Sequence, residues 1–449
     1  MTQFRSVCAC CLATIVGCAD GGAGSGDTGS TAADDDASAT NTSPGSATTP
    51  ASETAADGSD GPSTITGDDD GSDDGESGAN DDTGGGPFPP NPALADLADE
   101  TALDLGPFAC EGVPGEEPGL CQRATDYSGF VYDPHHHQML LFGGGHSTTM
   151  TDVIHAFDLG DTLTWSGLYQ PTPCDQMTVG NLDADNGAWT MGPGPYPRPV
   201  STHTYDMLAV PPMLDEFIVI SRNFSGGYCN AVGNDIGGRI AHFDRAAQTW
   251  SFSPMAEGST YDLAVNIPGS EPDPVSGAIV LFGGGGLASY DPMSRVYTQH
   301  VDTYNGDYGN LGNLEGIGYA NHMVYFPPDD RFYLFTHDGA GTVFALQFDR
   351  DAPEQSVAER LATTGTPPPG GEVGLDYDST NDVIGGAVID STFHAFDPAT
   401  LEWSAHAMNG GTPGNVAFHA LAYDPSDNVF IFVTDYDSGA RTWAYRLAN

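Results

Sequence analysis

The sequence predicts an all-β domain in which six four-stranded sheets form a propeller, with a seventh sheet possible in one long gap. Three observations predict this class: a motif repeated at a spacing near 50 residues, apolar strands without a polar face, and glycines that end these strands. A repeat of about 40–50 residues built from short strands is typical of propellers, whose sheets pack face to face around an axis.

The repeated motif is an aromatic residue followed by Asp, with a second aromatic residue six or seven positions after the Asp. Its clear copies are Phe157-Asp158 before Trp165, Phe243-Asp244 before Trp250, Tyr290-Asp291 before Tyr297 and Phe396-Asp397 before Trp403, and its weaker copies are Phe348-Asp349 and Tyr445-Arg446. Successive copies, counted at positions 158, 244, 291, 349, 397 and 446, are 86, 47, 58, 48 and 49 residues apart. The long first gap contains residues 170–196, rich in Pro, Gly and Asp, which we interpret as an inserted loop.

The second strand of each unit is a continuous apolar run, as in Met139–Phe142 and Val429–Val433. A strand with one wet face alternates apolar and polar residues, so the continuous runs indicate sheets buried on both faces. The last unit has only three predicted strands before Asn449. Because an open sheet edge would leave backbone groups unpaired, we expect the segment Glu100–Leu105 to supply the missing outer strand.

Glycine runs end two of these strands and carry a resemblance to a known family. The runs are Leu141-Phe142-Gly143-Gly144-Gly145 and Leu281-Phe282-Gly283-Gly284-Gly285, each followed by an aromatic-Asp motif, and Pro197-Arg198-Pro199 leading to His203 is a third matching piece. In these features residues 125–449 resemble the kelch-repeat family, which implies a kelch-like β-propeller.

A kelch-type propeller also forms the core of galactose oxidase, a copper enzyme that this chain resembles in architecture. That enzyme holds copper with Tyr and His, but this sequence has no adjacent Tyr-His pair. We therefore carry over no copper site, and the sequence assigns no metal ligand, no cofactor and no catalytic residue.

The first 18 residues predict export and lipid anchoring. Arg5 precedes a short apolar run ending in Ile15-Val16-Gly17-Cys18, which is too short for a permanent membrane helix and is typical of a signal peptide. The end of this run resembles the lipobox of bacterial lipoproteins, which implies that Cys18 is lipidated; an ordinary signal peptide cut nearby is the alternative. Residues 19–95 are almost entirely Gly, Ser, Thr, Ala, Asp and Pro, and predict a disordered acidic tether before a domain at residues 96–449.

The charge balance argues against anionic partners such as nucleic acids and anionic lipid surfaces. The chain has 62 acidic residues against 12 basic ones, all Arg, for a formal charge of −50. Nucleic acids and anionic lipid surfaces need a basic face, so neither is expected as a ligand of the folded domain.

Four cysteines remain after the signal peptide and Cys18, namely Cys110, Cys121, Cys174 and Cys229. An even number in an exported chain indicates two disulfides, for which three pairings are possible. Propeller geometry favours Cys174 with Cys229, because both lie in connections on the same face, and leaves Cys110 with Cys121.

The candidate ligand-binding residues lie near the inner strands or the long connections, and they are His146, His203, Asp206, Tyr228, His322, Glu372 and His419. Alignment of the inner strands places Ser128, Asp206, His322 and His419 at equivalent positions around the central channel. These groups either bind a ligand or a metal ion, or they only hydrate the channel. The tract His135-His136-His137 is interpreted as a polar turn, with a weak surface metal site as the alternative.

The predicted function is a surface-exposed, lipid-anchored binding module for a protein or glycan. The binding face is expected on the long connections at residues 169–200, 222–238, 302–318 and 362–372. The expected location is the cell envelope, at the outer surface or in the periplasm, or otherwise the external medium, and the expected state is a monomer. The alternative function is an extracellular enzyme on the same scaffold, either a galactose-oxidase-like oxidase or a hydrolase.

Overall fold

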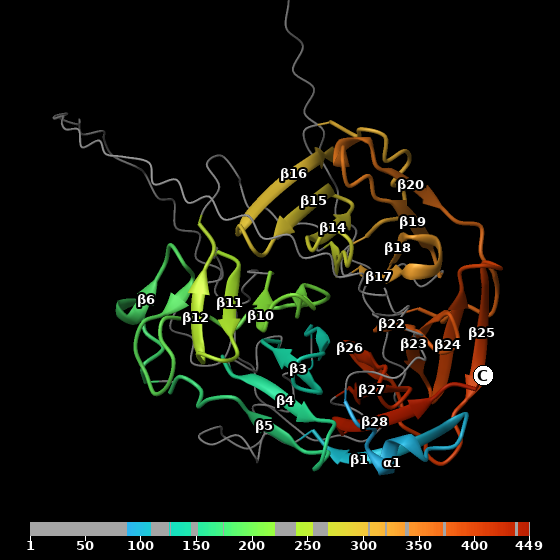
Figure 1. The fold of residues 1–449 in the computed structure, drawn as a ribbon, viewed down its shortest axis with the longest axis horizontal. Coiled ribbons are helices and arrows are strands. Elements are labelled where there is room, and N and C mark those ends of the chain that lie inside the picture. Colours follow the sequence, from blue (N-terminus) through green and yellow to red (C-terminus); the bar gives the residue numbers. More distant parts are fainter. Residues whose placement is uncertain are drawn as a thin grey trace, which may run out of the picture. The chain divides into compact units, whose positions relative to one another are not determined.

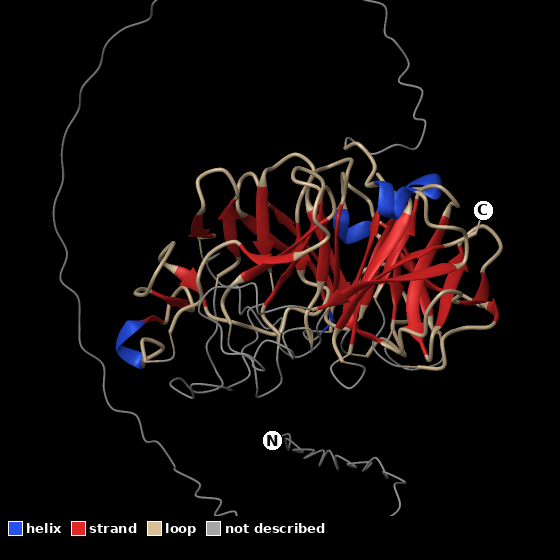
Figure 2. Cartoon of the chain, turned by 90° about the horizontal axis from the view of Figure 1, so that it is seen from below, coloured by secondary structure: helices blue, strands red, loops and turns tan. Residues whose placement is uncertain are grey.

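The computed structural model describes residues 88–108, 125, 127–144, 151–173, 175–220, 239–254, 268–303, 306–318, 321–336, 341–370, 374–435 and 439–448. All of them belong to one compact unit, Gly78–Asn449. Strands make up nearly all of its regular structure, and the short helices lie in connections (Figure 2). No helix among these residues has the length and apolar character needed to cross a membrane.

The described strands form six larger sheets and one small sheet. In chain order the larger sheets are β2 (Phe130–Asp133), β3 (Gln138–Phe142), β4 (Ile154–Asp158) and β5 (Trp165–Gly167); β9 (Leu208–Ala209), β10 (Glu216–Val219), β11 (Ala241–Asp244) and β12 (Thr249–Phe252); β13 (Gly269–Pro272), β14 (Ile279–Gly283), β15 (Gly286–Asp291) and β16 (Val296–Asp302); β17 (His322–Phe326), β18 (Arg331–Phe335), β19 (Val343–Gln347) and β20 (Val357–Arg360); β21 (Thr364–Gly365), β22 (Leu375–Asp378), β23 (Val383–Ile389), β24 (Thr392–Asp397) and β25 (Glu402–Ala407); and β26 (Val416–Asp424), β27 (Val429–Thr434), β28 (Arg441–Arg446) and β1 (Thr101–Pro107). The short helices are α1 (Pro92–Ala95), η2 (Val179–Asn181), η4 (Pro327–Asp329) and η5 (Pro353–Gln355).

The six larger sheets are arranged around a common centre, and their innermost strands are β2, β9, β13, β17, β22 and β26 (Figure 1). These inner strands contact one another in sequence, β2 with β9, β9 with β13, β13 with β17, β17 with β22 and β22 with β26, and β26 contacts β2 again. A closed ring of antiparallel sheets whose strands run outward from a central channel is the architecture of a β-propeller.

The burial of the second strands explains their continuous apolar sequence. Leu140 and Leu141 are adjacent on β3 and both are fully buried. Leu140 packs with Phe217 of the following sheet, whereas Leu141 packs with Ile431 of the last sheet. Successive side chains of one strand thus enter two different cores, and both faces of the sheet are dry.

Glycine is required where β3 ends. Gly143 has a φ of 81°, in the left-handed region that side chains rarely adopt, and a Cβ at this position would lie 2.1 Å from the carbonyl oxygen of Thr202. The first glycine run of the sequence therefore allows both a sharp turn and a close approach between two segments of backbone.

The predicted closure of the ring is confirmed. Strand β1 pairs antiparallel with β28, with Leu103 opposite Ala444, and completes the last sheet as its outer strand. Residues from near the beginning of the described chain therefore share a sheet with residues near its end (Figure 1).

Two details differ from the sequence-based expectations. The first gap is not only loop, because it holds a small three-stranded sheet of β6 (Leu182–Asp183), β7 (Ala188–Trp189) and β8 (Arg198–Pro199). The packed chain also begins before residue 96, since α1 has Asn91 as its N-cap and its Leu94 is fully buried in the core of the first and last sheets. One buried leucine next to a capping asparagine gave too weak a pattern to be separated from the polar segment before it.

Candidate functional site

Three polar side chains converge at the centre of the ring. Asp206 lies just before β9, His322 is the first residue of β17, and His419 lies on β26. His322 Nδ1 is 2.7 Å from Asp206 Oδ1 and 3.1 Å from His419 Nδ1, and potential ligand atoms of all three residues lie within 4.8 Å of one another. All three side chains are buried. We call this group the channel cluster.

Contacts with the backbone hold the channel cluster in place. Asp206 Oδ2 accepts hydrogen bonds from the amide N–H groups of Ser270 and Met323, at 2.9 and 2.8 Å, so one carboxylate joins three successive sheets. On the far side of the imidazole, His322 Nε2 contacts the carbonyl oxygen of Leu375. Such a contact fixes the orientation of the ring and directs Nδ1 toward Asp206 and His419.

The charge state of the channel cluster follows from burial and pairing. Burial disfavours the imidazolium of His322, but the Asp206 carboxylate beside it and the hydrogen bonds to Asp206 and Leu375 outweigh this, so the pKa of His322 lies above its ordinary value. Burial raises the pKa of Asp206, and the adjacent His322 opposes that rise. The pair therefore shares a proton tightly at neutral pH when no other cation is bound.

Two further carboxylates, Glu271 on β13 and Asp376 on β22, line the channel above the cluster. Burial, followed by repulsion from Asp376 and Asp206, raises the pKa of Glu271 well above its ordinary value. Burial also raises the pKa of Asp376 to about 6, although the amide N–H groups of Tyr423 and Tyr377 donate hydrogen bonds to it. The channel thus concentrates acidic groups that are costly to ionise without a counter-charge, and it favours a cationic or neutral ligand over an anion.

A cavity of about 430 Å³ extends from the channel cluster toward the turns that follow the inner strands. Its walls include Asp206, His322, Glu271 and Asp376, the tyrosines Tyr132, Tyr325, Tyr377 and Tyr423, and turn prolines such as Pro134, Pro274 and Pro425. This volume lies in the range typical of small-molecule sites, about 300–1,000 Å³.

An aromatic group covers the other side of the channel cluster. The ring of Tyr127 stacks on His203 at a centroid distance of 4.8 Å and contacts Phe418 at 4.2 Å, while Tyr205 meets His419 edge-on at 6.0 Å. Tyr127, Tyr205 and Phe418 have φ values of 58°, 46° and 44°. Three bulky residues in this unfavourable region are held there by the surrounding structure, as is common near functional sites.

The donor set of the channel cluster suits a divalent transition metal ion. Bonds of about 2.0–2.1 Å to imidazole nitrogen and carboxylate oxygen, arranged tetrahedrally, place neighbouring ligand atoms about 3.3 Å apart. The separations of 2.7 and 3.1 Å around His322 Nδ1 are slightly shorter than that spacing, so small outward movements would admit an ion. Imidazole ligands favour Zn²⁺ and similar ions over Ca²⁺ and Mg²⁺, which prefer oxygen. The sequence analysis named a metal ion as one possible occupant of this ring of groups but assigned no metal ligand, and the structure supplies the distances between the donor atoms.

Of the residues predicted from sequence, the structure brings together Asp206, His322 and His419. His203 is also buried and belongs to the aromatic group beside them. The other predicted residues lie outside the described part of the chain; they are His146, Tyr228 and Glu372, the four cysteines Cys110, Cys121, Cys174 and Cys229, and Cys18.

The histidine tract lies in the turn between β2 and β3, as expected, but His137 is only 4% exposed and its Nε2 lies 3.1 Å from Asp424 Oδ2 of the last sheet. The burial of His137 was not expected, because the last sheet covers this turn through a contact that no local sequence pattern reveals.

Glu271 and Asp376 were missed by the sequence reasoning. Both stand two residues before an Asp at the end of an inner strand or directly after it, in Glu271-Pro272-Asp273 and Asp376-Tyr377-Asp378. An acidic residue at that position could have identified both as channel residues, because alternate residues of an inner strand face the channel.

Comparisons with known proteins do not assign this chain to a family. No protein-family model matches it, and no curated protein matches it. Among solved structures, it is similar to a structural genomics protein of unknown function from Bacteroides thetaiotaomicron VPI-5482, with a TM-score of 0.43 and 9% identity over 71% of this chain and 69% of that one. It is also similar to regucalcin, a calcium-binding protein from Agrobacterium tumefaciens str. C58, with a TM-score of 0.41 and 13% identity over 78% of this chain and 92% of that one.

Proposed function

We propose that the protein is a lipid-anchored binding module of the cell envelope whose central channel binds a glycan through a divalent transition metal ion held by Asp206, His322 and His419. The observation that carries this proposal is the convergence of two imidazole nitrogens and a carboxylate oxygen within 4.8 Å of one another at the end of the cavity. Three protein ligands leave further coordination positions for ligand oxygens.

The cavity supports a glycan rather than a protein as the ligand. About 430 Å³ accommodates a small saccharide or the end of a chain, not a folded surface. The walls combine tyrosine rings with the carboxylates of Glu271 and Asp376. Aromatic rings stack on the apolar faces of sugars, and carboxylates accept hydrogen bonds from their hydroxyl groups. Binding would then occur in the channel and not on the long connections that the sequence favoured.

We also propose a more specific class for the fold. The six aromatic-Asp motifs and the two glycine runs support a six-bladed kelch-like propeller, with each larger sheet as one blade and the small sheet β6–β8 as an insertion. The lipid anchor rests on the run that ends at Cys18, and placement at the outer surface or in the periplasm follows from it.

An extracellular enzyme is the second candidate function. The open coordination positions that would bind sugar oxygens would also bind water, and a bound divalent ion lowers the pKa of that water. Hydrolysis of the bound glycan, rather than simple retention, would indicate this alternative.

Zinc binding by the full chain in detergent tests the proposal. We expect His322→Gln and His419→Gln each to weaken one zinc site by more than about 100-fold, since even partners in the outer shell contribute about 10–100-fold. His406→Gln is the matched control, because His406 is a half-buried imidazole that pairs with Glu100 far from the channel cluster. Equal zinc binding by His322→Gln and His406→Gln would overturn the metal site.

A glycan array probed with zinc-loaded and chelator-treated protein tests the ligand. Binding that requires both zinc and an intact His322 is the expected result. Failure of every glycan to bind, with zinc affinity intact, would refute the glycan and leave the metal site standing.

A further inference from the structure

A second polar cluster lies where the ring closes, outside the channel. It consists of His137, in the turn between β2 and β3, Asp424, at the end of β26, and Asp427, in the turn before β27. We call these residues the seam cluster. They are 4%, 0% and 2% exposed, and His137 Nε2 lies 3.1 Å from Asp424 Oδ2 and 3.8 Å from Asp427 Oδ2.

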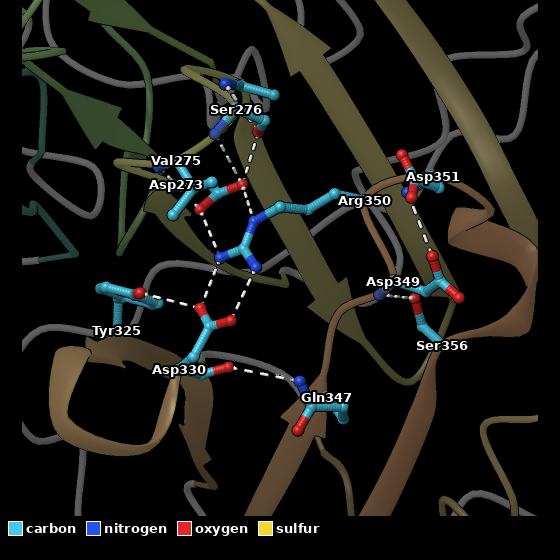
Figure 3. A network of polar contacts seen from close by, with 11 residues as sticks. Asp273, Val275, Ser276, Tyr325, Asp330, Gln347, Asp349, Arg350, Asp351 and Ser356 are labelled. Atoms are coloured by element: carbon cyan, nitrogen blue, oxygen red, sulfur yellow. Dashed lines mark hydrogen bonds and ion pairs between the residues drawn. The ribbon is translucent and has the colours of Figure 1, made fainter.

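At two other junctions between neighbouring sheets a buried aspartate pairs with an arginine, and the seam cluster has no such arginine. Asp133 ends β2 as Asp424 ends β26, and Asp133 pairs with Arg245 of the next sheet at 2.6 Å. Asp273, which follows β13, pairs in the same way with Arg350 of the next sheet at 2.8 Å (Figure 3). In both cases the arginine directly follows the aromatic-Asp motif of that next sheet.

No arginine occupies the equivalent position at the seam. The sheet that follows β26 in the ring is the first one, and the residue after its Phe157-Asp158 motif is Leu159. The amide N–H of Leu159 donates a hydrogen bond to the carbonyl oxygen of His137, so His137 stands beside the place where an arginine would enter. Two buried carboxylates therefore face one imidazole at the seam cluster, whereas at each of the other two junctions one buried carboxylate, Asp133 or Asp273, pairs with an arginine.

One carboxylate oxygen of the seam cluster lacks a hydrogen-bond partner among the described residues. Asp427 Oδ1 accepts a hydrogen bond from the amide N–H of Asn91 at 2.7 Å, and Asp424 Oδ1 accepts one from the amide N–H of Ser426 at 2.9 Å. Asp427 Oδ2, which lies toward His137, is buried and has no hydrogen-bond partner among the described residues. Burying such an atom without a partner is unfavourable, and a cation between the carboxylates and the imidazole removes the penalty.

We propose that the seam cluster binds a divalent transition metal ion such as Zn²⁺ through His137 Nε2 and the carboxylates of Asp424 and Asp427. The potential ligand atoms lie within 4.8 Å of one another, and ligands of a bound zinc ion stand about 3–3.5 Å apart, so closure around the ion needs only small movements. The mixed nitrogen and oxygen donor set suits the same class of ion as the channel cluster, but the site is independent of it.

The ion would also stabilise the position of residues 88–95, which lead from the N-terminal region into the ring. The ring of Phe88 lies parallel to the imidazole of His137, with centroids 4.9 Å apart and planes at 4°. Asn91 binds Asp427 through its amide N–H and donates from Nδ2 to the carbonyl oxygen of Leu159 at 3.0 Å. A metal ion that fixes His137 and Asp427 therefore stabilises residues 88–95 against the closing sheets, and loss of the ion loosens them.

The test is zinc titration of the chelator-stripped full chain in detergent, with the number of bound ions counted for each variant. We expect His137→Gln and the isosteric Asp427→Asn to lose one zinc ion that His136→Gln retains. His136 is the matched control, because it is the neighbour in the same tract, its side chain is 35% exposed, and it contacts Asp133 and Asp215 instead. His322→Gln should lose only the channel ion, so failure of one site is distinguished from failure of the other.

Hydrogen exchange gives the second measurement. Zinc should slow exchange of the Asn91 amide in the wild type and in His322→Gln by at least about tenfold, and should leave it unchanged in His137→Gln and Asp427→Asn. If His137→Gln, Asp427→Asn and His136→Gln bind the same number of zinc ions, or if zinc does not change the exchange at Asn91, a shared proton and not a metal ion balances the seam, and the proposal is wrong.

Discussion

His322 and His419 stack at the centre of the ring with their planes 11° apart and their Nδ1 atoms 3.1 Å apart, although 97 residues separate them in the chain. Only one proton fits between two nitrogens that face each other at this distance, and Asp206 approaches the same point. A bound metal ion satisfies all three groups at once, whereas a proton satisfies two. The binding function proposed for the channel depends on this pair.

The pair Asp273–Arg350 should be the strongest single contact between the third and fourth sheets. Arg350 donates to both Asp273 and Asp330, and the Asp273 side chain is fully buried (Figure 3). Arg350→Met leaves that carboxylate without its partner, and we expect a loss of about 3 kcal/mol in the free energy of unfolding, since breaking a buried pair costs about 3–5 kcal/mol and Arg350 is one-fifth exposed. Urea denaturation at pH 7 measures it.

The same variant has a pH signature. Burial raises the pKa of Asp273, but hydrogen bonds from Arg350 and Ser276 outweigh burial and hold that pKa below its ordinary value. The stabilisation is therefore present above about pH 4 and is lost as the pH falls through the lowered pKa. Arg331→Met is the control, because the Arg331 guanidinium reaches Gln347 on the surface. An Arg350→Met effect no larger than the control, or one that persists unchanged at pH 2.5, would contradict this account.

The sheet order and the channel cluster were within reach of the sequence because they follow from repetition. Six copies of one motif define equivalent positions, and equivalent positions on inner strands face a common axis, so Asp206, His322 and His419 meet. The seam cluster could not be predicted from the sequence. His137 and Asp424 are 287 residues apart and belong to different sheets, so their contact exists only because the last sheet packs against the first.

Asp376→Asn should remove a pH dependence of stability. The pKa of Asp376 is raised to about 6, mainly by burial, so the folded state binds this proton more tightly than the unfolded chain does. Wild-type stability then falls as the pH rises from about 4 to 6, and an amide does not titrate. The melting temperature of Asp376→Asn relative to wild type should increase across this range. Asp382→Asn is the control for loss of a carboxylate, at an exposed turn where Asp382 accepts a hydrogen bond from Tyr377. A flat difference between Asp376→Asn and wild type would show that Asp376 has an ordinary pKa.

The closing strand should be essential to the stability of the ring. Leu103→Pro places a proline inside β1, opposite Ala444 of β28, removes a backbone donor from the strand, and should lower the free energy of unfolding by about 1–3 kcal/mol. Asp104→Ala is the adjacent control, since it removes a half-exposed ion pair with Arg441 and an exposed hydrogen bond from the Gly106 amide, and exposed pairs of this kind are worth less than about 1 kcal/mol. Urea denaturation of both variants checks the difference, and equal midpoints would mean that β1 is dispensable.

Anomalous diffraction at the zinc absorption edge, from crystals of the protein soaked in zinc, tests the channel site most directly. The account predicts a peak about 2.0–2.2 Å from His322 Nδ1, His419 Nδ1 and a carboxylate oxygen of Asp206. A map at saturating zinc with no peak among these three residues, and with His322 still bonded directly to Asp206, would contradict it.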